Sequence, residues 1–92
     1  MRGDRNARTL VEEAAFRVTL TALKAGTRLR EHRAAGWVSI QATEGHLRVH
    51  LSKREVDLPA GRVVVLEPGV THDVEAVDVE SAFLLTVALR EA

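Results

Sequence analysis

The chain has 92 residues, with 13 acidic and 13 basic side chains, no cysteine and three aromatic residues. This length suits one domain, and such a small monomer buries only about 60–65% of its unfolded surface, so self-association would add stability. The lack of cysteine excludes disulfides and thiolate metal sites. Balanced charge and few aromatic rings argue against a nucleic-acid-binding surface.

The start of the chain carries charge without an apolar segment behind it. No apolar run approaches the roughly 18 residues of a membrane-spanning helix, and the apolar stretch of a secretory signal is missing. We therefore expect a cytoplasmic protein with neither a membrane nor a nucleic acid as partner. Arg2, Arg5 and Arg8 are compatible with a small anion-binding arm, but Asp4 interrupts them. This interruption favours a solvated and frayed terminus.

Residues 1–15 are expected to be a lead-in to the domain, and the only trace of helical periodicity lies between Thr9 and Ala15. The next segment, residues 16–22, alternates with a period of two, which predicts a half-buried strand. One face of this strand carries Phe16, Val18, Leu20 and Ala22, and the other carries Arg17, Thr19 and Thr21.

Short strands continue to the C-terminus. They are predicted at residues 37–43, 46–51, 56–58, 62–66, 73–77 and 82–89, separated by turns rich in Gly, Pro and charged residues. The predicted strand 62–66 is apolar from Val63 to Leu66, which indicates a strand covered on both faces. Turns every eight to twelve residues are typical of a β-sandwich or barrel, so residues 16–92 are predicted to form one all-β domain.

Two glycine-rich turns are each followed by a histidine. In the first, Gly26 precedes His32 by six positions, and Gly45 closes the motif; in the second, Gly61 and Gly69 precede His72. This arrangement resembles the two signature motifs of the cupin superfamily, G-x5-H-x-H-x3,4-E-x6-G and G-x5-P-x-G-x2-H-x3-N. The resemblance implies a double-stranded β-helix, or jelly-roll, cupin barrel that brings His32 and His72 together.

The chain departs from both motifs at positions that matter for metal binding. Ala34 stands in place of the second histidine, Val38 in place of the glutamate, and Ala76 in place of the asparagine. Metal-binding cupins use three His and one Glu, so the resemblance implies an incomplete cage here. We expect no obligatory cofactor and at most a weakly bound divalent transition metal between His32 and His72. Glu67 is the carboxylate that we would expect to serve as a further ligand to such a metal.

The expected ligand pocket is mainly apolar. It comprises His32, Ala34, Val38, Ile40, His72, Val74 and Ala76. The two imidazoles would anchor a small polar group, act as acid or base, or be satisfied by water and backbone. Three functions stay open: binding of a small molecule without obligatory metal, which we favour; a metal-dependent oxygenase or isomerase; and a structural or interaction module with a vestigial pocket.

Two further features bear on partners. His46 and His50 share one strand face but lie about 13 Å apart, too far for one metal ion, so an exposed or interfacial face is expected. Trp37 shares the outward face of its strand with Ser39, Gln41 and Thr43. An outward indole favours a homodimer interface, with packing under the segment around Leu10 as the alternative.

Overall fold

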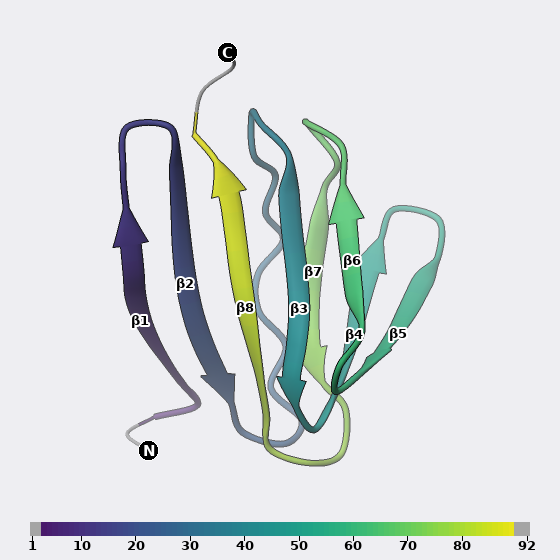
Figure 1. Ribbon diagram of the computed structural model, residues 1–92. Helices are drawn as coiled ribbons and strands as arrows, with labels where there is room; N and C mark the ends of the chain where they lie inside the picture. The colour runs from purple at the N-terminus through teal and green to yellow at the C-terminus, as the bar shows by residue number, and fades with distance from the viewer. Residues whose placement is uncertain (1–2, 90–92) are drawn as a thin grey trace.

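The computed structural model describes residues 3–89, which form eight strands and no helix (Figure 1). The strands are β1 (Arg5–Glu12), β2 (Phe16–Leu23), β3 (Val38–Glu44), β4 (His46–Leu51), β5 (Glu55–Pro59), β6 (Val63–Leu66), β7 (His72–Ala76) and β8 (Ser81–Ala88). All paired strands are antiparallel. The all-β prediction is therefore confirmed. Residues 3–89 contain no helix that is long and apolar enough to cross a membrane.

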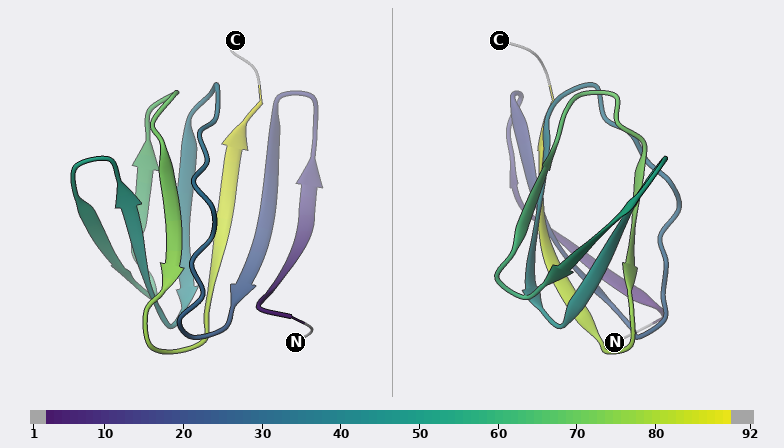
Figure 2. Two further views of the ribbon diagram at one scale, coloured as in Figure 1. Left: turned by 180° about the vertical axis from the view of Figure 1, so that it is seen from behind. Right: turned by 90° about the vertical axis from the view of Figure 1, so that its right-hand side faces the viewer.

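Two sheets pack face to face (Figure 2). The five-stranded sheet has the order β1-β2-β8-β3-β6, and the three-stranded sheet has the order β5-β4-β7. After β2 and β3 the chain changes sheet repeatedly, which is the winding of a double-stranded β-helix. The core comes from both inner faces, and its buried apolar residues are Leu23, Val38, Ile40, Ala42, Leu47, Val49, Leu58, Leu66, Val74, Ala76 and Phe83.

The segment between β2 and β3 acts as an irregular fourth strand on the edge of β7. The Leu29 amide donates to the Val74 carbonyl at 2.9 Å. Further along, the amides of His32 and His72 each donate to the carbonyl of the other residue, at 2.7 and 2.8 Å. These bonds satisfy an otherwise open sheet edge and fix the two histidines opposite each other.

Gly45 forms the tight connection where the chain passes from β3 to β4. Its φ is +76°, and an added Cβ would overlap the Ser81 hydroxyl and the Glu80 carbonyl. Glycine adopts this left-handed conformation without a steric cost. The Ser81 hydroxyl in turn accepts the His46 amide at 3.0 Å, so the crossover is held to the start of β8.

The N-terminal segment differs from the expected lead-in. Residues Arg5–Glu12 form β1, an edge strand paired with β2, rather than a frayed terminus or a helical turn. Cross-strand pairing overrides the weak local periodicity between Thr9 and Ala15, and the register shifts between Thr9 and Val11. Arg2 lies outside the described residues.

The faces of β2 are the reverse of those that its apolar alternation suggests. Thr21 and Leu23 point into the protein and are buried, whereas Phe16 is 39% exposed. The pairing of Thr21 with Phe83 and of Leu20 with Leu84 sets this orientation. Both faces of the strand carry groups that can be buried, so the alternation identifies two faces without saying which one is inside.

The apolar strand β6 is not covered on both faces as expected. It is the edge strand of the five-stranded sheet, and Val63 and Val65 are 53% and 58% exposed on the outer side. On β3, by contrast, the predicted faces are confirmed: Val38 and Ile40 are buried and Trp37, just before the strand, is exposed. Packing of Trp37 under the N-terminal segment is therefore not observed.

Candidate functional site

The structure brings together the two motif histidines, which are 40 positions apart in the chain. His32 lies on the irregular segment beside β7, and His72 is the first residue of β7. Their ring centroids are 6.4 Å apart, with an angle of 46° between the ring planes. His72 is buried and His32 is exposed, so the pair reaches from the interior to the surface.

The ring of His72 is oriented by the backbone. Its Nδ1 lies 3.1 Å from the Val70 carbonyl oxygen, which can only accept a hydrogen bond. Nδ1 must therefore carry the proton in this bond, and Nε2 is left for a ligand or water. No carboxylate within residues 3–89 forms an ion pair with either ring. The turn before β7 thus positions one imidazole nitrogen for recognition.

Two cavities adjoin the histidine pair. The inner slot has a volume of about 130 Å³ and is lined by Arg5, Ala7, Thr21, Leu29, His32, His72, Asp73, Val74, Phe83 and Leu85. The second cavity, of about 330 Å³, is lined by Arg17, His32, Arg33, Ala34, Val38, His72, Leu85 and Val87. Most of the wall atoms are hydrocarbon, and polar groups come from a few side chains. Such a mixture is typical of small-molecule sites.

The pocket residues expected from the sequence fall into two groups. His32 and His72 line both cavities, Val74 lines the inner slot, and Ala34 and Val38 line the second cavity. Ile40 and Ala76 are fully buried and belong to the core beneath.

Several wall residues lie outside the sequence expectation. Thr21, Phe83 and Leu85 enter the slot because β2 and β8 turn these side chains inward, and Leu29 enters from the irregular segment. The apolar stretch 82–89 already indicated a strand, but apart from Thr86 the residues on both of its faces are apolar. Only the register against β2 and β3 identifies the inner set.

Two imidazoles do not fit a tightly held metal ion, the group that the fold family implies. No cluster of three His, Cys, Asp or Glu side chains that could hold an ion is found among residues 3–89. Glu67, the carboxylate expected as a further ligand, is exposed in its turn. A tetrahedral ion with bonds of about 2.0–2.1 Å would bring the two ring centroids to roughly 5 Å. The rings would have to approach from 6.4 Å.

An ion pair between a half-exposed arginine and a buried carboxylate lies next to the inner slot. Nε and Nη2 of Arg28 donate to the two carboxylate oxygens of Asp73, each at 3.0 Å. Asp73 is 3% exposed, whereas the Arg28 side chain is 53% exposed. The hydrogen bonds to Asp73 raise the pKa of Arg28 above its ordinary value. This bidentate pair neutralises the buried carboxylate and ties the irregular segment to β7.

His46 and His50 point away from the cavities. They share the outer face of the three-stranded sheet with charged residues of β4, β5 and β7. His50 lies between two carboxylates, with Nδ1 3.1 Å from Glu55 and Nε2 2.8 Å from Glu75. The face that was expected to be exposed or interfacial carries charged side chains, but the His50 side chain is only 10% exposed because its partners cover it.

Comparisons with known proteins agree with the presence of cavities in this domain. Residues 18–92 match the sequence model described as the AraC-like ligand binding domain. A search of curated proteins finds no significant match.

The fold is shared with many solved structures. A conserved protein of unknown function from Streptococcus pyogenes has a TM-score of 0.89 and 23% identity over 100% of this chain and 80% of its own. A cupin superfamily protein from Desulfitobacterium hafniense has a TM-score of 0.90 and 13% identity over 98% and 82%. An RmlC-like cupin from Desulfovibrio desulfuricans has a TM-score of 0.83 and 25% identity over 92% and 82%. The shared fold leaves the ligand open.

Proposed function

This chain belongs to the AraC-like ligand binding domain family and has the cupin fold, and from this premise we propose that it binds a small organic molecule beside His32 and His72. The observation that supports the proposal most is that His32, which is exposed, and His72, which is buried, both line the same two cavities. Apolar walls favour a hydrocarbon body, and Nε2 of His72 offers one directional hydrogen bond.

A ligand screen by thermal shift tests this function. A ligand at ten times its Kd stabilises the folded state by about 1.4 kcal/mol, which raises the Tm of a domain of this size by several degrees. His72→Ala should abolish the response because it removes the inner imidazole, whereas His46→Ala, on the outer face, should leave it unchanged. A flat response to a chemically broad screen would instead support a module with a vestigial pocket.

The metal-dependent alternative has its own test. Protein purified without a histidine tag is analysed for bound metal and then titrated with Zn²⁺, Ni²⁺ and Cu²⁺. We expect at most weak binding that both His32→Ala and His72→Ala reduce, since two neutral imidazoles supply few donors and no charge. Stoichiometric metal that survives dialysis would contradict this expectation and favour an enzyme.

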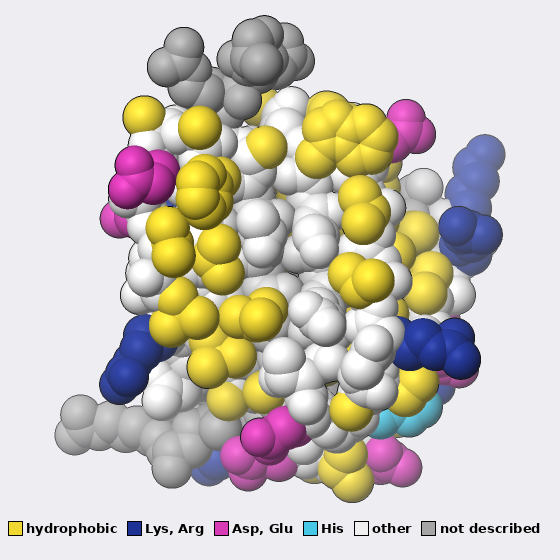
Figure 3. Space-filling view, in the orientation of Figure 1, with side chains coloured by type: hydrophobic (Ala, Val, Ile, Leu, Met, Phe, Trp, Pro, Cys, Tyr) yellow, Lys and Arg dark blue, Asp and Glu magenta, His cyan; other side chains and the backbone are white. Residues whose placement is uncertain are grey.

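We further propose that the protein is a homodimer through the outer face of the five-stranded sheet. Six large apolar side chains on or beside this sheet are exposed: Leu10, Val11, Phe16, Trp37, Val63 and Val65. Figure 3 shows this face as a field of apolar and uncharged groups, with charged side chains toward its margins. Such a face fits a second copy of itself better than a charged partner.

The total surface supports a partner for this face. The accessible area is 6040 Å². An average monomer of this mass exposes about 5,300 Å², and a standard interface buries about 800 Å² per partner. Light scattering over a concentration series should give twice the mass of 10.1 kDa. A monomer at high micromolar concentration would contradict the dimer.

A further inference from the structure

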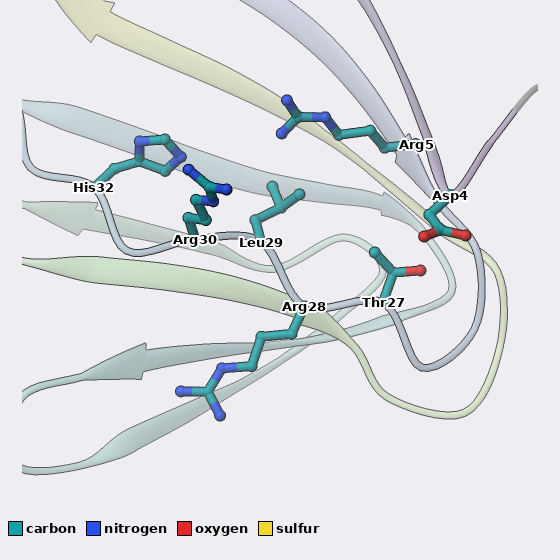
Figure 4. A pocket seen from close by; sticks show the side chains of 7 residues that line it. All are labelled: Asp4, Arg5, Thr27, Arg28, Leu29, Arg30 and His32. Atoms are coloured by element: carbon teal, nitrogen blue, oxygen red, sulfur yellow. The ribbon is translucent and has the colours of Figure 1, made fainter.

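A third cavity opens beside the inner slot and carries most of the local charge. This cavity, the vestibule, has a volume of about 620 Å³ and shares Arg5, Leu29 and His32 with the slot. Its remaining lining residues are Asp4, Thr27, Arg28 and Arg30 (Figure 4). A molecule in the slot would therefore face three arginines and one aspartate at its outer end.

The arginines of the vestibule are not equivalent. Arg28 is bound to the buried carboxylate of Asp73, and in Figure 4 its side chain turns away from those of Arg5 and His32. Arg5 and Arg30 have no ion pair with a carboxylate within residues 3–89. Asp4 lines the same cavity and offsets one of these two charges. The vestibule thus keeps an excess of one positive charge, which matches a monoanion.

The position of Arg5 follows from strand register. Arg5 pairs with Leu23, whose side chain is fully buried, so both residues face the inside of the five-stranded sheet. Arg8, three positions later on β1, pairs with Leu20 and lines a separate cavity on the outer face. Arg5 also lies before residue 18, where the family match begins. The cation therefore comes from an edge strand outside the matched region.

The slot determines the size and polarity of the group at the other end of the ligand. Leu29, Val74, Phe83 and Leu85 supply an apolar wall to about 130 Å³. A dry apolar cavity of about 150 Å³ accommodates a benzene ring, so the slot has room for a body of roughly that size. Besides Arg5 and His32, which the slot shares with the vestibule, its polar wall groups are Thr21, His72 and the Asp73 carboxylate, and Arg28 already neutralises that carboxylate.

We propose that the ligand of this site is a small organic monocarboxylate with an apolar body, whose carboxylate is held by Arg5 and Arg30 in the vestibule while the body fills the slot beside His72. This inference rests on the proposed function and adds the ligand class to it. Guanidinium groups bind carboxylates through paired hydrogen bonds, and a cleft of one charge sign concentrates the opposite ion.

Three probes of one shape and different charge test the inference: benzoate, benzamide and benzylamine. Binding is followed by amide chemical shifts of the full chain at low salt. Benzoate should bind at least about tenfold more tightly than benzamide, because hydrogen bonds to a charged group are stronger. Benzylamine, which is a cation, should bind most weakly of the three. Raising the salt to 0.5 M should weaken benzoate and leave benzamide unchanged, since only the charged probe is screened.

Two variants and one matched control locate the charge. Arg5→Gln and Arg30→Gln should each weaken benzoate about tenfold without changing benzamide. Arg8→Gln, on the same strand but the opposite face, should change neither, and unaltered Tm values confirm that the variants fold. Equal affinities for benzoate and benzamide, or an unaffected Arg5→Gln variant, would overturn the anion selectivity and leave the binding function standing. No binding of any probe, together with a flat broad screen, would overturn both.

Discussion

The two sheets present opposite kinds of outer face. On the five-stranded sheet, Trp37, Val63 and Val65 are more than half exposed. On the three-stranded sheet, Arg48 lies between Glu55 and Asp57, and His50 lies between Glu55 and Glu75. The inner faces of both sheets are apolar, and the two sheets differ in their outer faces.

This difference indicates whether each outer face is better suited to contact with water or with another protein surface. A network of exposed ion pairs contributes little to stability, but it keeps a sheet face hydrated and discourages apolar contact. Exposed apolar area contributes about 25 cal/mol per Å² only when another surface covers it. The charged face is therefore favourable in water, whereas the apolar outer face is stabilised only if another surface covers it, as in the homodimer that we propose.

The largest effects on stability are expected on the inner faces, which are apolar and buried in both sheets. Ile40 on β3 and Leu47 on β4 are both fully buried, one on each inner face. Ile40→Ala and Leu47→Ala should each lower the free energy of unfolding by about 2–5 kcal/mol through lost burial and a residual cavity. Chemical denaturation measures both. A cost below 1 kcal/mol for either one would show that its sheet does not share the common core.

The connection from β3 to β4, where the chain passes from one sheet to the other, should be nearly as sensitive to substitution. Gly45→Ala adds a methyl group against Ser81 and Glu80 at a positive φ, and we expect a loss of about 2–4 kcal/mol. Gly61→Ala is the matched control: it has a φ of +92° but nothing within 4 Å of the added carbon. It should cost only about 1–2 kcal/mol from backbone strain. Equal costs for the two variants would contradict the tight crossover.

The apolar outer face is tested by placing a charge on it. Trp37→Glu should weaken dimerisation about 30-fold or more, because a large aromatic residue near an interface centre typically contributes 2 kcal/mol or more. Analytical ultracentrifugation measures the dissociation constant. Ser52→Glu, in the exposed β4–β5 turn, adds the same single negative charge away from this face and should leave the dimer intact. A dimer unaffected by Trp37→Glu would place the interface elsewhere.

The strands could be predicted well from the sequence because nearby residues determine where each strand begins and ends. Each expected strand from residue 37 onward is present within two residues, since glycine, proline and charged clusters fix the turns. The meeting of His32 and His72 was expected as well, because the resemblance to the two cupin motifs implies a barrel that brings these residues together. These features depend on the chain alone or on a repeated motif spacing.

What could not be predicted depends on register between distant strands. The inward side of β2 is set by pairing with β8, and the strand β1 exists only because β2 offers it an edge. Arg5 was therefore expected in a frayed terminus, although it lines the slot. The exposure of Val63 and Val65 likewise depends on β6 being an edge strand whose outer face no other element covers.

The smallest predicted effect concerns the charged face. Arg48 Nε lies 3.4 Å from Asp57 Oδ1, and both side chains are partly exposed. A double-mutant cycle of Arg48→Ala and Asp57→Ala should give a coupling of about 0.2–1 kcal/mol that falls as salt is raised, because solvent and ions screen the pair. Arg8→Ala with Asp57→Ala, on opposite faces, should be additive. A coupling that persists undiminished at 0.5 M salt would mean that the pair is shielded from solvent, and this face would then resemble an interface rather than a hydrated surface.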